Sequence, residues 1–290
     1  MEKAVYITDL HQLKYVNGGY KRLYFGNEFC ERQIPSLGCF QRVLLYAERK
    51  KLQVTLVTPY VTDLGLKRIE ILFDFLGKRG VSCEIVINDW GVLHLVNQKY
   101  QNLMPVLGRL LTKQKRCPRA IKLLKRETQL RLLQGPPENP NSSQLVFQRK
   151  LPLAVDPYYK GSNALSVPII HEFLIKYRVR RIELDNVGQG LWLELPLGKI
   201  AASIYTPYVY ISTTFFCLSA GCEQKKTSLL KIKPCNHPCR RYVFKLRHKT
   251  MHKELFLKGN TQFYKNDRVA IRPLAKMGVD RIVYQPEIPV

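Results

Sequence analysis

The sequence predicts an α/β protein built on a (β/α) barrel of the TIM type, whether regular, distorted or incomplete. Short β-branched runs alternate with amphipathic stretches over most of the chain, which is the pattern of βα units around a parallel sheet. The length of 290 residues and the apolar content of 46% supply one large core. Since so many βα units follow one another, a barrel is favoured over an open doubly wound sheet.

Seven short runs are the candidates for strands. They are rich in β-branched and aromatic residues, and turn-forming or polar residues end several of them. In a barrel the chemistry gathers at the carboxyl ends of the strands, so residues directly after these runs are the first candidates for a site. The runs are 22–26 (RLYFG), 53–60 (QVTLVTPY), 83–89 (CEIVIND), 104–109 (MPVLGR), 181–186 (RIELDN), 199–205 (KIAASIY) and 281–285 (RIVYQ).

Three stretches between these runs have the pattern of helices. Residues 62–80 open with a Thr or Asp cap, repeat apolar residues at spacings of three and four, and stop at a glycine. Residues 166–179 have Pro168 near their start, where proline is well tolerated. Residues 269–280 show the same pattern, and Pro273 is expected to shorten that helix.

The organisation that follows is one (β/α)-barrel domain over residues 1–290. Residues 134–144, QGPPENPNSSQ, crowd Gly, Pro, Asn and Ser together and predict a loop excursion from the barrel. A second special segment, 217–239, is rich in cysteine. No internal repeat is visible.

The compartment is predicted to be the cytoplasm. No run of eighteen apolar residues predicts a transmembrane segment, and the start of the chain lacks a basic region followed by an apolar core and a cleavage site. In that compartment thiols stay reduced. The eight cysteines are therefore expected to be core residues or metal ligands.

Four cysteines fall within 27 residues and suggest a soft-ligand site. Cys235 and Cys239 are separated by three residues, so both thiolates can face one ion or cluster. A third ligand is Cys217 or Cys222, and Cys30 follows a predicted strand, which in a barrel would bring it to the same face.

Four thiolates fit tetrahedral zinc or an iron-sulfur cluster. One short pair with two distant single cysteines favours the cluster, because structural zinc usually comes as two short pairs. His237 lies between the paired cysteines as an alternative zinc ligand or a hydrogen-bond donor to sulfur. The alternative is that a cysteine is buried in the core and binds no metal, and this interpretation is strongest for Cys39, Cys83 and Cys117.

Four stretches resemble the collagenase-like peptidase family, family thirty-two of the peptidases of unassigned catalytic type. LYFGNEFC is similar to its strand and first cluster cysteine, and INDWGVLHL to a strand-end segment with Asn88, Asp89 and Gly91. LMPVLGRLLTKQKRCPR is similar to the next strand and loop, while YTPYVYISTTFFC and CNHPC look like the remaining cluster segment. The likeness is greatest to the short, barrel-only UbiV-like members.

This resemblance implies a 4Fe-4S cluster held by Cys30, Cys235, Cys239 and either Cys217 or Cys222. It also implies a paralogous partner subunit in a heterodimer and oxygen-independent hydroxylation of a quinone precursor or a related modification. An RNA-binding factor for base hydroxylation is the alternative. A peptidase comes third, because the Glu and Gly that precede the paired cysteines of peptidase members are absent before Cys217.

Five strand-end side chains are candidates for catalysis or substrate binding. Asp89 and Asp185 could act as general acid or base, with helix capping or a turn as the competing interpretation. Arg109 could clamp the carboxylates of an organic oxygen donor, or be a surface residue of a basic helix. Asn88 could bind substrate, and Tyr60 could stack on its ring or pack in the barrel rim.

The charge balance points to an anionic partner, because 47 Lys and Arg against 22 Asp and Glu give a formal charge of +25. Residues 109–131 and 225–253 hold much of the excess. The second block interleaves Tyr242, Phe244 and His248 with cations, as an RNA surface would. However, its alternating RYVFKLRH run is also the pattern of a half-exposed strand, which we prefer.

Overall fold

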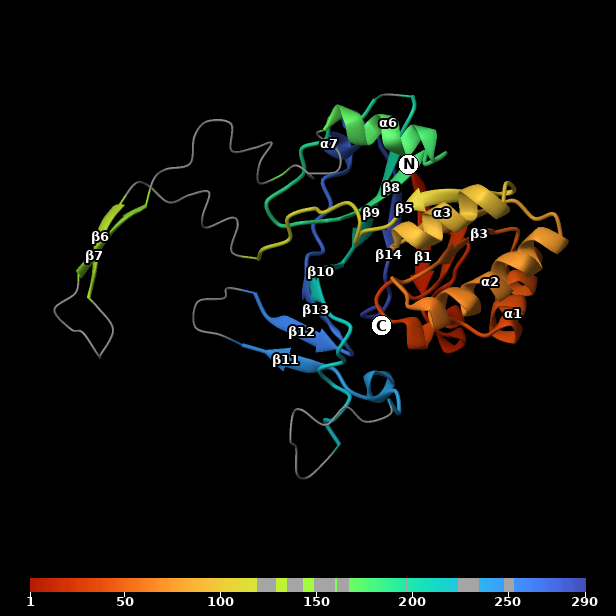
Figure 1. The fold of residues 1–290 in the computed structure, drawn as a ribbon, viewed down its shortest axis with the longest axis horizontal. Helices are drawn as coiled ribbons and strands as arrows, with labels where there is room; N and C mark the ends of the chain where they lie inside the picture. Colours follow the sequence, from red (N-terminus) through yellow and green to blue (C-terminus); the bar gives the residue numbers. More distant parts are fainter. Residues whose placement is uncertain are drawn as a thin grey trace.

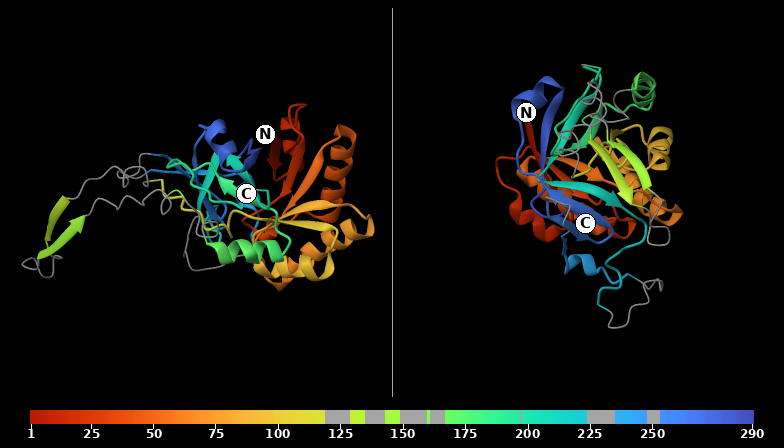
Figure 2. Two further views of the ribbon diagram at one scale, coloured as in Figure 1. Left: turned by 90° about the horizontal axis from the view of Figure 1, so that it is seen from above. Right: turned by 90° about the vertical axis from the view of Figure 1, so that its left-hand side faces the viewer.

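The computed structural model describes residues 1–118, 129–134, 143–148, 160, 167–196, 198–223, 235–247 and 253–290. Eight parallel strands close into a barrel (Figures 1 and 2), which confirms the predicted α/β TIM-like fold. Around the barrel they are β1 (Glu2–Ile7), β14 (Val279–Tyr284), β9 (Ala201–Thr206), β8 (Arg181–Asp185), β5 (Leu103–Leu107), β4 (Cys83–Ile87), β3 (Gln53–Val57) and β2 (Arg22–Gly26).

Each of the seven predicted runs overlaps a barrel strand, and β1 is the strand that the sequence patterns did not reveal. Its pairing closes the barrel, with Glu2 opposite Arg281 on β14 and Ala4 opposite Arg22 on β2. The first and last strands of the barrel are therefore neighbours.

The described helices are α1 (Leu37–Lys50), α2 (Asp63–Lys78), α3 (Trp90–Lys99), α6 (Pro168–Lys176) and α7 (Ile271–Lys276). The three predicted helices correspond to α2, α6 and α7, and α7 contains only six residues, with Pro273 inside it. Thr62 Oγ1 caps α2 by accepting a hydrogen bond from the backbone N–H of Gly65. Among the described residues, no helix has the length and apolar character needed to cross a membrane.

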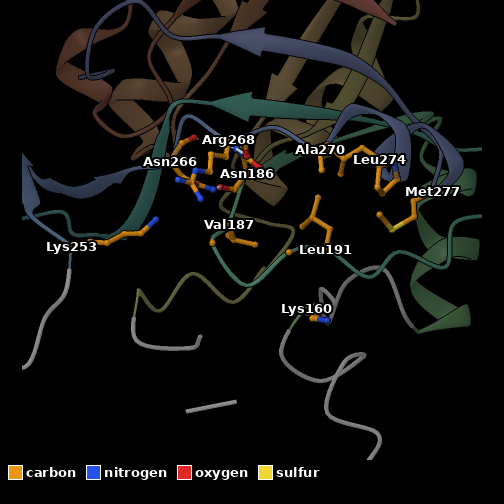
Figure 3. Close-up of a pocket in the computed structure, with 13 residues that line it drawn as sticks. Lys160, Asn186, Val187, Leu191, Lys253, Asn266, Arg268, Ala270, Leu274 and Met277 are labelled. Carbon is orange, nitrogen blue, oxygen red and sulfur yellow. Dashed lines mark hydrogen bonds between the residues drawn. The ribbon is translucent and has the colours of Figure 1, made fainter. Parts of the chain in front are cut away.

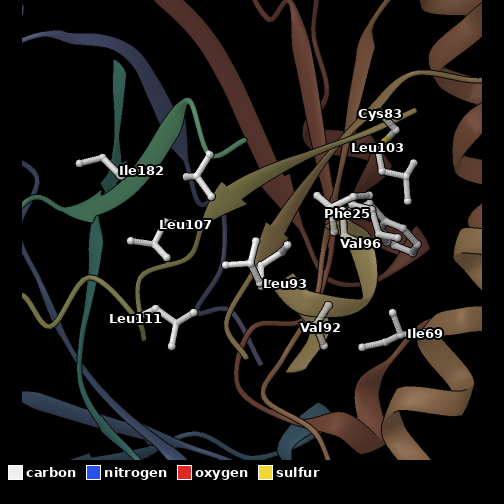
Figure 4. Close-up of a cluster of buried hydrophobic side chains, with 14 of the residues drawn as sticks. Phe25, Ile69, Cys83, Val92, Leu93, Val96, Leu103, Leu107, Leu111 and Ile182 are labelled. Atoms are coloured by element: carbon white, nitrogen blue, oxygen red, sulfur yellow. The ribbon is translucent and has the colours of Figure 1, made fainter. Parts of the chain in front are cut away.

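Two apolar layers surround the strands. The outer layer fills the space between strands and helices, and Figure 4 shows Phe25, Ile69 and Val96 among its members. The inner layer lies inside the barrel and is unusually aromatic, because Tyr6 and Tyr24 meet the ring of Tyr205 edge to face at centroid distances of 5.9 and 6.0 Å. The barrel interior is thus packed with side chains that carry polar groups.

A second sheet is inserted between β9 and β14. Its four antiparallel strands follow the order β10 (Tyr208–Thr213), β13 (Thr261–Lys265), β12 (Leu255–Lys258) and β11 (Phe244–Leu246). Figure 1 shows it beside the barrel. The strand expected in RYVFKLRH is confirmed as β11, but the sheet itself was not predicted. This insertion carries the cysteine-rich segment 217–239.

A third, two-stranded antiparallel sheet joins β6 (Gln129–Gln134) to β7 (Ser143–Gln148). The predicted loop excursion, 134–144, includes Gln134 of β6 and Ser143 and Gln144 of β7, so these three residues belong to strands. Residues 135–142 lie outside the described residues, as do 119–128 in the first basic block and 224–234 and 248–252 in and around the second.

Candidate functional site

Cys30 is held in a tight turn directly after β2. Gly26 ends the strand at φ +131°, and a side chain there would collide with the carbonyl of Val57 on β3. Asn27, 1% exposed, then accepts hydrogen bonds at 2.9 Å from the backbone N–H groups of Phe29 and Cys30. The position of the Cys30 thiol is therefore set by buried backbone contacts.

Cys239 lies on a short 3-10 helix, η3 (Pro238–Arg240), in the inserted sheet's connection. Its side chain is buried against Phe29 and Phe263. Gln33, on the 3-10 turn η2 (Glu31–Gln33) after Cys30, donates a hydrogen bond from Nε2 to Cys239 Sγ at 3.3 Å. This contact joins residues 206 positions apart and docks η3 against the end of β2.

Four thiols in this region lie close enough for some of them to raise the pKa of others. Burial raises the pKa of the Cys30 thiol to about 11, and three neighbouring thiols add to the rise. Burial also raises the pKa of Cys239, as do two of the same neighbours. The thiols that act on Cys30 belong to Cys239, Cys217 and Cys235.

Cys222 occupies a different position from these four. It is exposed, and its pKa is raised by slight burial, by the Glu223 carboxylate and by the thiol of Cys217. Cys217 itself is half-buried in the turn after β10. Of the two candidates for a third ligand, Cys217 is the one whose thiol contributes to the raised pKa of Cys30.

Two other side chains that could bind a metal, Glu31 and His237, also lie in this region. The nearby carboxylate of Glu31 accepts hydrogen bonds from the backbone N–H and Oγ1 of Thr62, both at 2.8 Å, and so is occupied at the start of α2. His237 Nδ1 lies 3.2 Å from Nε2 of Gln33. In the described part of the chain, no three Cys, His, Asp or Glu side chains are arranged at ligand spacing, so metal binding stays a prediction.

Arg109, the predicted carboxylate clamp, is fully buried at the carboxyl end of the barrel. Its guanidinium donates Nε to Glu28 Oε2 at 2.9 Å and Nη1 to Asp185 Oδ1 at 2.8 Å, and it stacks 4.0 Å from the ring centroid of Tyr205. The alternative of a surface residue on a basic helix is wrong, since the side chain is 0% exposed. Internal carboxylates already occupy this clamp.

Asp185 is the acceptor at the other end of this charge cluster. Its second oxygen accepts a hydrogen bond from Arg116 Nε. Gln114 Nε2 donates a hydrogen bond to the backbone carbonyl of Asp185 at 3.0 Å. The Asp185 carboxylate thus lies between the guanidinium groups of Arg109 and Arg116. Its present contacts are therefore those of a structural ion pair.

The neighbouring candidates also have internal partners. Asp89 accepts hydrogen bonds from the backbone N–H groups of Gly91 and Val92, the capping role given as its alternative. Asn88 joins strand ends by donating Nδ2 to the Thr58 carbonyl at 2.9 Å and accepting from the N–H of Leu110 at 3.1 Å.

Tyr60 lies at the junction between the barrel and the inserted sheet. Its hydroxyl donates to the Thr214 carbonyl at 2.8 Å, and its ring meets Phe215 edge to face at 4.4 Å. Burial raises the pKa of Tyr60, and the nearby Cys30 thiol contributes to that rise. Tyr60 thus packs in the rim of the barrel, which was the alternative to stacking on a substrate ring, and it borders the thiol site.

Sequence reasoning missed three residues of this region: Glu28, Arg116 and Gln33. A signal for Glu28 was present in the sequence, because a charged residue two positions after a buried strand seldom remains without a cationic partner. Of the three cysteines expected to be packing residues, Cys83 is buried in the core, Cys39 is half-buried and Cys117 is exposed.

Comparisons with known proteins found similarity at a low level. No model of a known family matches the sequence, and no curated protein does. A solved U32 peptidase is similar with a TM-score of 0.43 and 9% identity, covering 100% of this chain and 94% of its own. A glycoside hydrolase family 18 N-acetylglucosaminidase from Paenibacillus barengoltzii reaches 0.37 and 8%, covering 98% and 94%. At these levels neither says anything about chemistry here, and the barrel rests on its own strand pairing.

Proposed function

We propose that this barrel is an iron-sulfur protein in which Cys30, Cys217, Cys235 and Cys239 hold a 4Fe-4S cluster. The supporting observation is the approach of these thiols from the end of β2, the turn after β10 and the η3 connection. Sulfur-only donor sets suit iron-sulfur clusters and zinc. The spacing of one short pair and two single cysteines favours the cluster.

The surrounding side chains are suited to protecting such a group. Phe29, Phe263 and Tyr210 form an apolar wall behind Cys239, which limits access of water. Gln33 Nε2 donates to the Cys239 sulfur and would stabilise negative charge there. When bound, a cluster with four thiolate ligands supplies one-electron transfer.

The reaction that we propose is an oxygen-independent hydroxylation of a quinone precursor in the cytoplasm, carried out with a paralogous subunit. This part rests on the family resemblance of the four sequence stretches. Because Arg109 is occupied by Glu28 and Asp185, we assign it to holding the barrel mouth together, and substrate contacts fall to side chains outside that cluster.

The described residues do not favour the RNA alternative. Arg247 on the β11 side pairs with Glu254 at 2.6 Å, and Arg241 pairs with Glu223 at 2.6 Å. These exposed cations have carboxylate partners, which reduces the positive field available to phosphate. RNA modification therefore remains the runner-up.

The test of the cluster is anaerobic purification with quantification of iron, sulfide and zinc. The wild-type protein is expected to be brown, with absorption near about 400 nm and about four iron and four sulfide per chain. Cys30→Ser and Cys217→Ser should lose the chromophore, while Cys222→Ser, the matched control, should keep it. Stoichiometric zinc in colourless protein would overturn the cluster, and loss with Cys222→Ser but not Cys217→Ser would overturn the ligand assignment.

The reaction is tested in anaerobically grown cells that lack the protein. They should accumulate an under-hydroxylated quinone precursor, and complementation with Cys30→Ser should fail. Normal quinone together with loss of a hydroxylated RNA nucleoside would instead support the runner-up.

A further inference from the structure

A cavity of about 620 Å³ lies between the turn after β8, the segment 266–270 and helix α7 (Figure 3). This volume is within the usual range of small-molecule sites, roughly 300–1,000 Å³. Its lining includes neither a cysteine nor any residue of the Arg109 cluster. The cavity is thus distinct from the thiol site.

The wall of the cavity is built from well-anchored residues. Asn186, 6% exposed, donates Nδ2 to the carbonyls of Asn266 and Arg268 at 3.1 and 2.8 Å. Asn266 returns a hydrogen bond from its Nδ2 to the Asn186 carbonyl at 2.7 Å. This reciprocal pair ties the β8 turn to the segment before α7 and so anchors one wall of the cavity.

Glycine keeps the turn side of the cavity open. Gly190, at φ +85°, closes the turn by donating its N–H to the Val187 carbonyl at 3.2 Å. Gly188 N–H is held by the Tyr264 hydroxyl at 3.2 Å. Neither glycine has a side chain to fill the space, and both lie in the lining.

The two ends of the cavity differ in chemistry. Lys253 and Arg268 lie toward one end, and Leu274 and Met277 lie toward the other, with Leu191 between them (Figure 3). A third cation, Lys160, lies below Leu191 in this view. None of the thirteen described residues that line it is acidic. A site with cations at one end and apolar side chains at the other matches a molecule with an anionic head and an apolar body.

The charged form of Lys253 is destabilised by its surroundings, and a bound anion would offset this. Its ammonium lies 4.8 Å from the ring centroid of Tyr264. Burial lowers its pKa, and the Arg268 guanidinium adds to that lowering, while the Asp267 carboxylate opposes it. Asp267 is itself paired with Lys265 at 3.3 Å. An anion between two neighbouring cations would stabilise both charged forms.

We propose that this cavity binds a small amphipathic anion, a carboxylate or phosphate monoester with an apolar chain or ring, whose head lies between Lys253 and Arg268 and whose body packs on Leu191, Leu274 and Met277.

Calorimetric titration with three eight-carbon probes tests the site at low ionic strength: octanoate, octyl phosphate and uncharged octan-1-ol. Octanoate or octyl phosphate should bind saturably with one site per chain and octan-1-ol far more weakly, and the stronger anion identifies the head group. Affinity should also rise from butanoate to octanoate, by up to roughly fourfold per buried methylene.

The variant Lys253→Gln/Arg268→Gln should weaken binding of the anion roughly tenfold, since two partly exposed charge contacts are lost. The matched control is Arg272→Gln/Lys276→Gln, which removes the same charge from exposed α7 positions outside the lining and should leave binding unchanged. Met277→Gln should flatten the dependence on chain length. Equal binding of octan-1-ol and the anions, equal losses in both double variants, or no saturable binding would overturn the proposal.

Discussion

Replacing Arg109 with methionine tests whether a buried charge cluster holds the barrel mouth together. Methionine keeps much of the side-chain length but has no charge or hydrogen-bond donors. Glu28 would lose the guanidinium that it contacts through Nε and Nη2, and Asp185 would keep only Arg116. The perturbation therefore leaves one buried carboxylate without a cation.

The size of the effect follows from burial. Arg109, Glu28 and Asp185 are all 0% exposed, so solvent screens none of these interactions. Removing one partner of a buried ion pair costs about 3–5 kcal/mol, because the remaining charge is uncompensated. The lost stacking on Tyr205 adds up to about 2 kcal/mol. We expect the free energy of unfolding to fall by about 3–7 kcal/mol, which is a large part of a typical total.

The assay is equilibrium urea unfolding at neutral pH, followed by circular dichroism. Arg79→Met is the control, since Arg79 and Glu48 form an exposed pair at 3.5 Å, and it should cost less than about 1 kcal/mol. Arg109→Met/Glu28→Gln should recover at least about 1 kcal/mol, because a neutral amide costs less to bury than a charge. Equal losses in Arg109→Met and Arg79→Met, or no recovery in the double variant, would refute the reasoning.

Three further changes are expected to have measurable effects. Gly108→Ala would place a methyl group 2.5 Å from Cγ of Asn88 and displace its two hydrogen bonds, so urea unfolding should show a loss of about 2–4 kcal/mol. Gly26→Ala should destabilise the fold at least as much, because the added methyl group collides with backbone atoms of Val57 and Gly26 has a positive φ. A poor yield of folded Gly26→Ala beside a normal yield of the control Gly38→Ala would support this. Burial raises the pKa of Glu183 to about 8, so the folded protein retains a proton that the unfolded chain releases, and stability should fall as pH rises from about 4.5 to about 8. Glu183→Gln should flatten that slope by up to about 1.4 kcal/mol per pH unit, and an unchanged slope would contradict the assignment.

The barrel could be predicted because seven of its eight strands overlap short apolar runs, several of them bounded by turn-forming or polar residues. The local sequence pattern is enough to predict such strands. The same holds for α2, whose ends are marked by the Thr62 cap and by a glycine shortly after the helix. The inserted sheet could not be predicted in the same way. Strands such as Leu255–Lys258 and Thr261–Lys265 are four and five residues long with mixed polarity, and their order depends on pairing across the insertion.

The cysteines of the candidate site could be predicted from the sequence, but the buried ion pairs of Arg109 could not. The thiols could be proposed from their spacing and from the strand end before Cys30. The role of Arg109 could not, because its partners lie 81 and 76 residues away along the chain. An arginine that looks free in a basic block is, after folding, enclosed by carboxylates that local sequence does not associate with it.

The parallel seam between β1 and β14 has a consequence for how the chain is made. Because β14 also pairs with β9, the edges of both β1 and β9 stay exposed on the ribosome until Val279–Tyr284 has been synthesised. A nascent chain halted after the inserted sheet would present two unpaired strand edges of a nearly complete cylinder, which is a substrate for chaperones and a template for aggregation. Synthesis of the final strand is the event that removes both hazards at once.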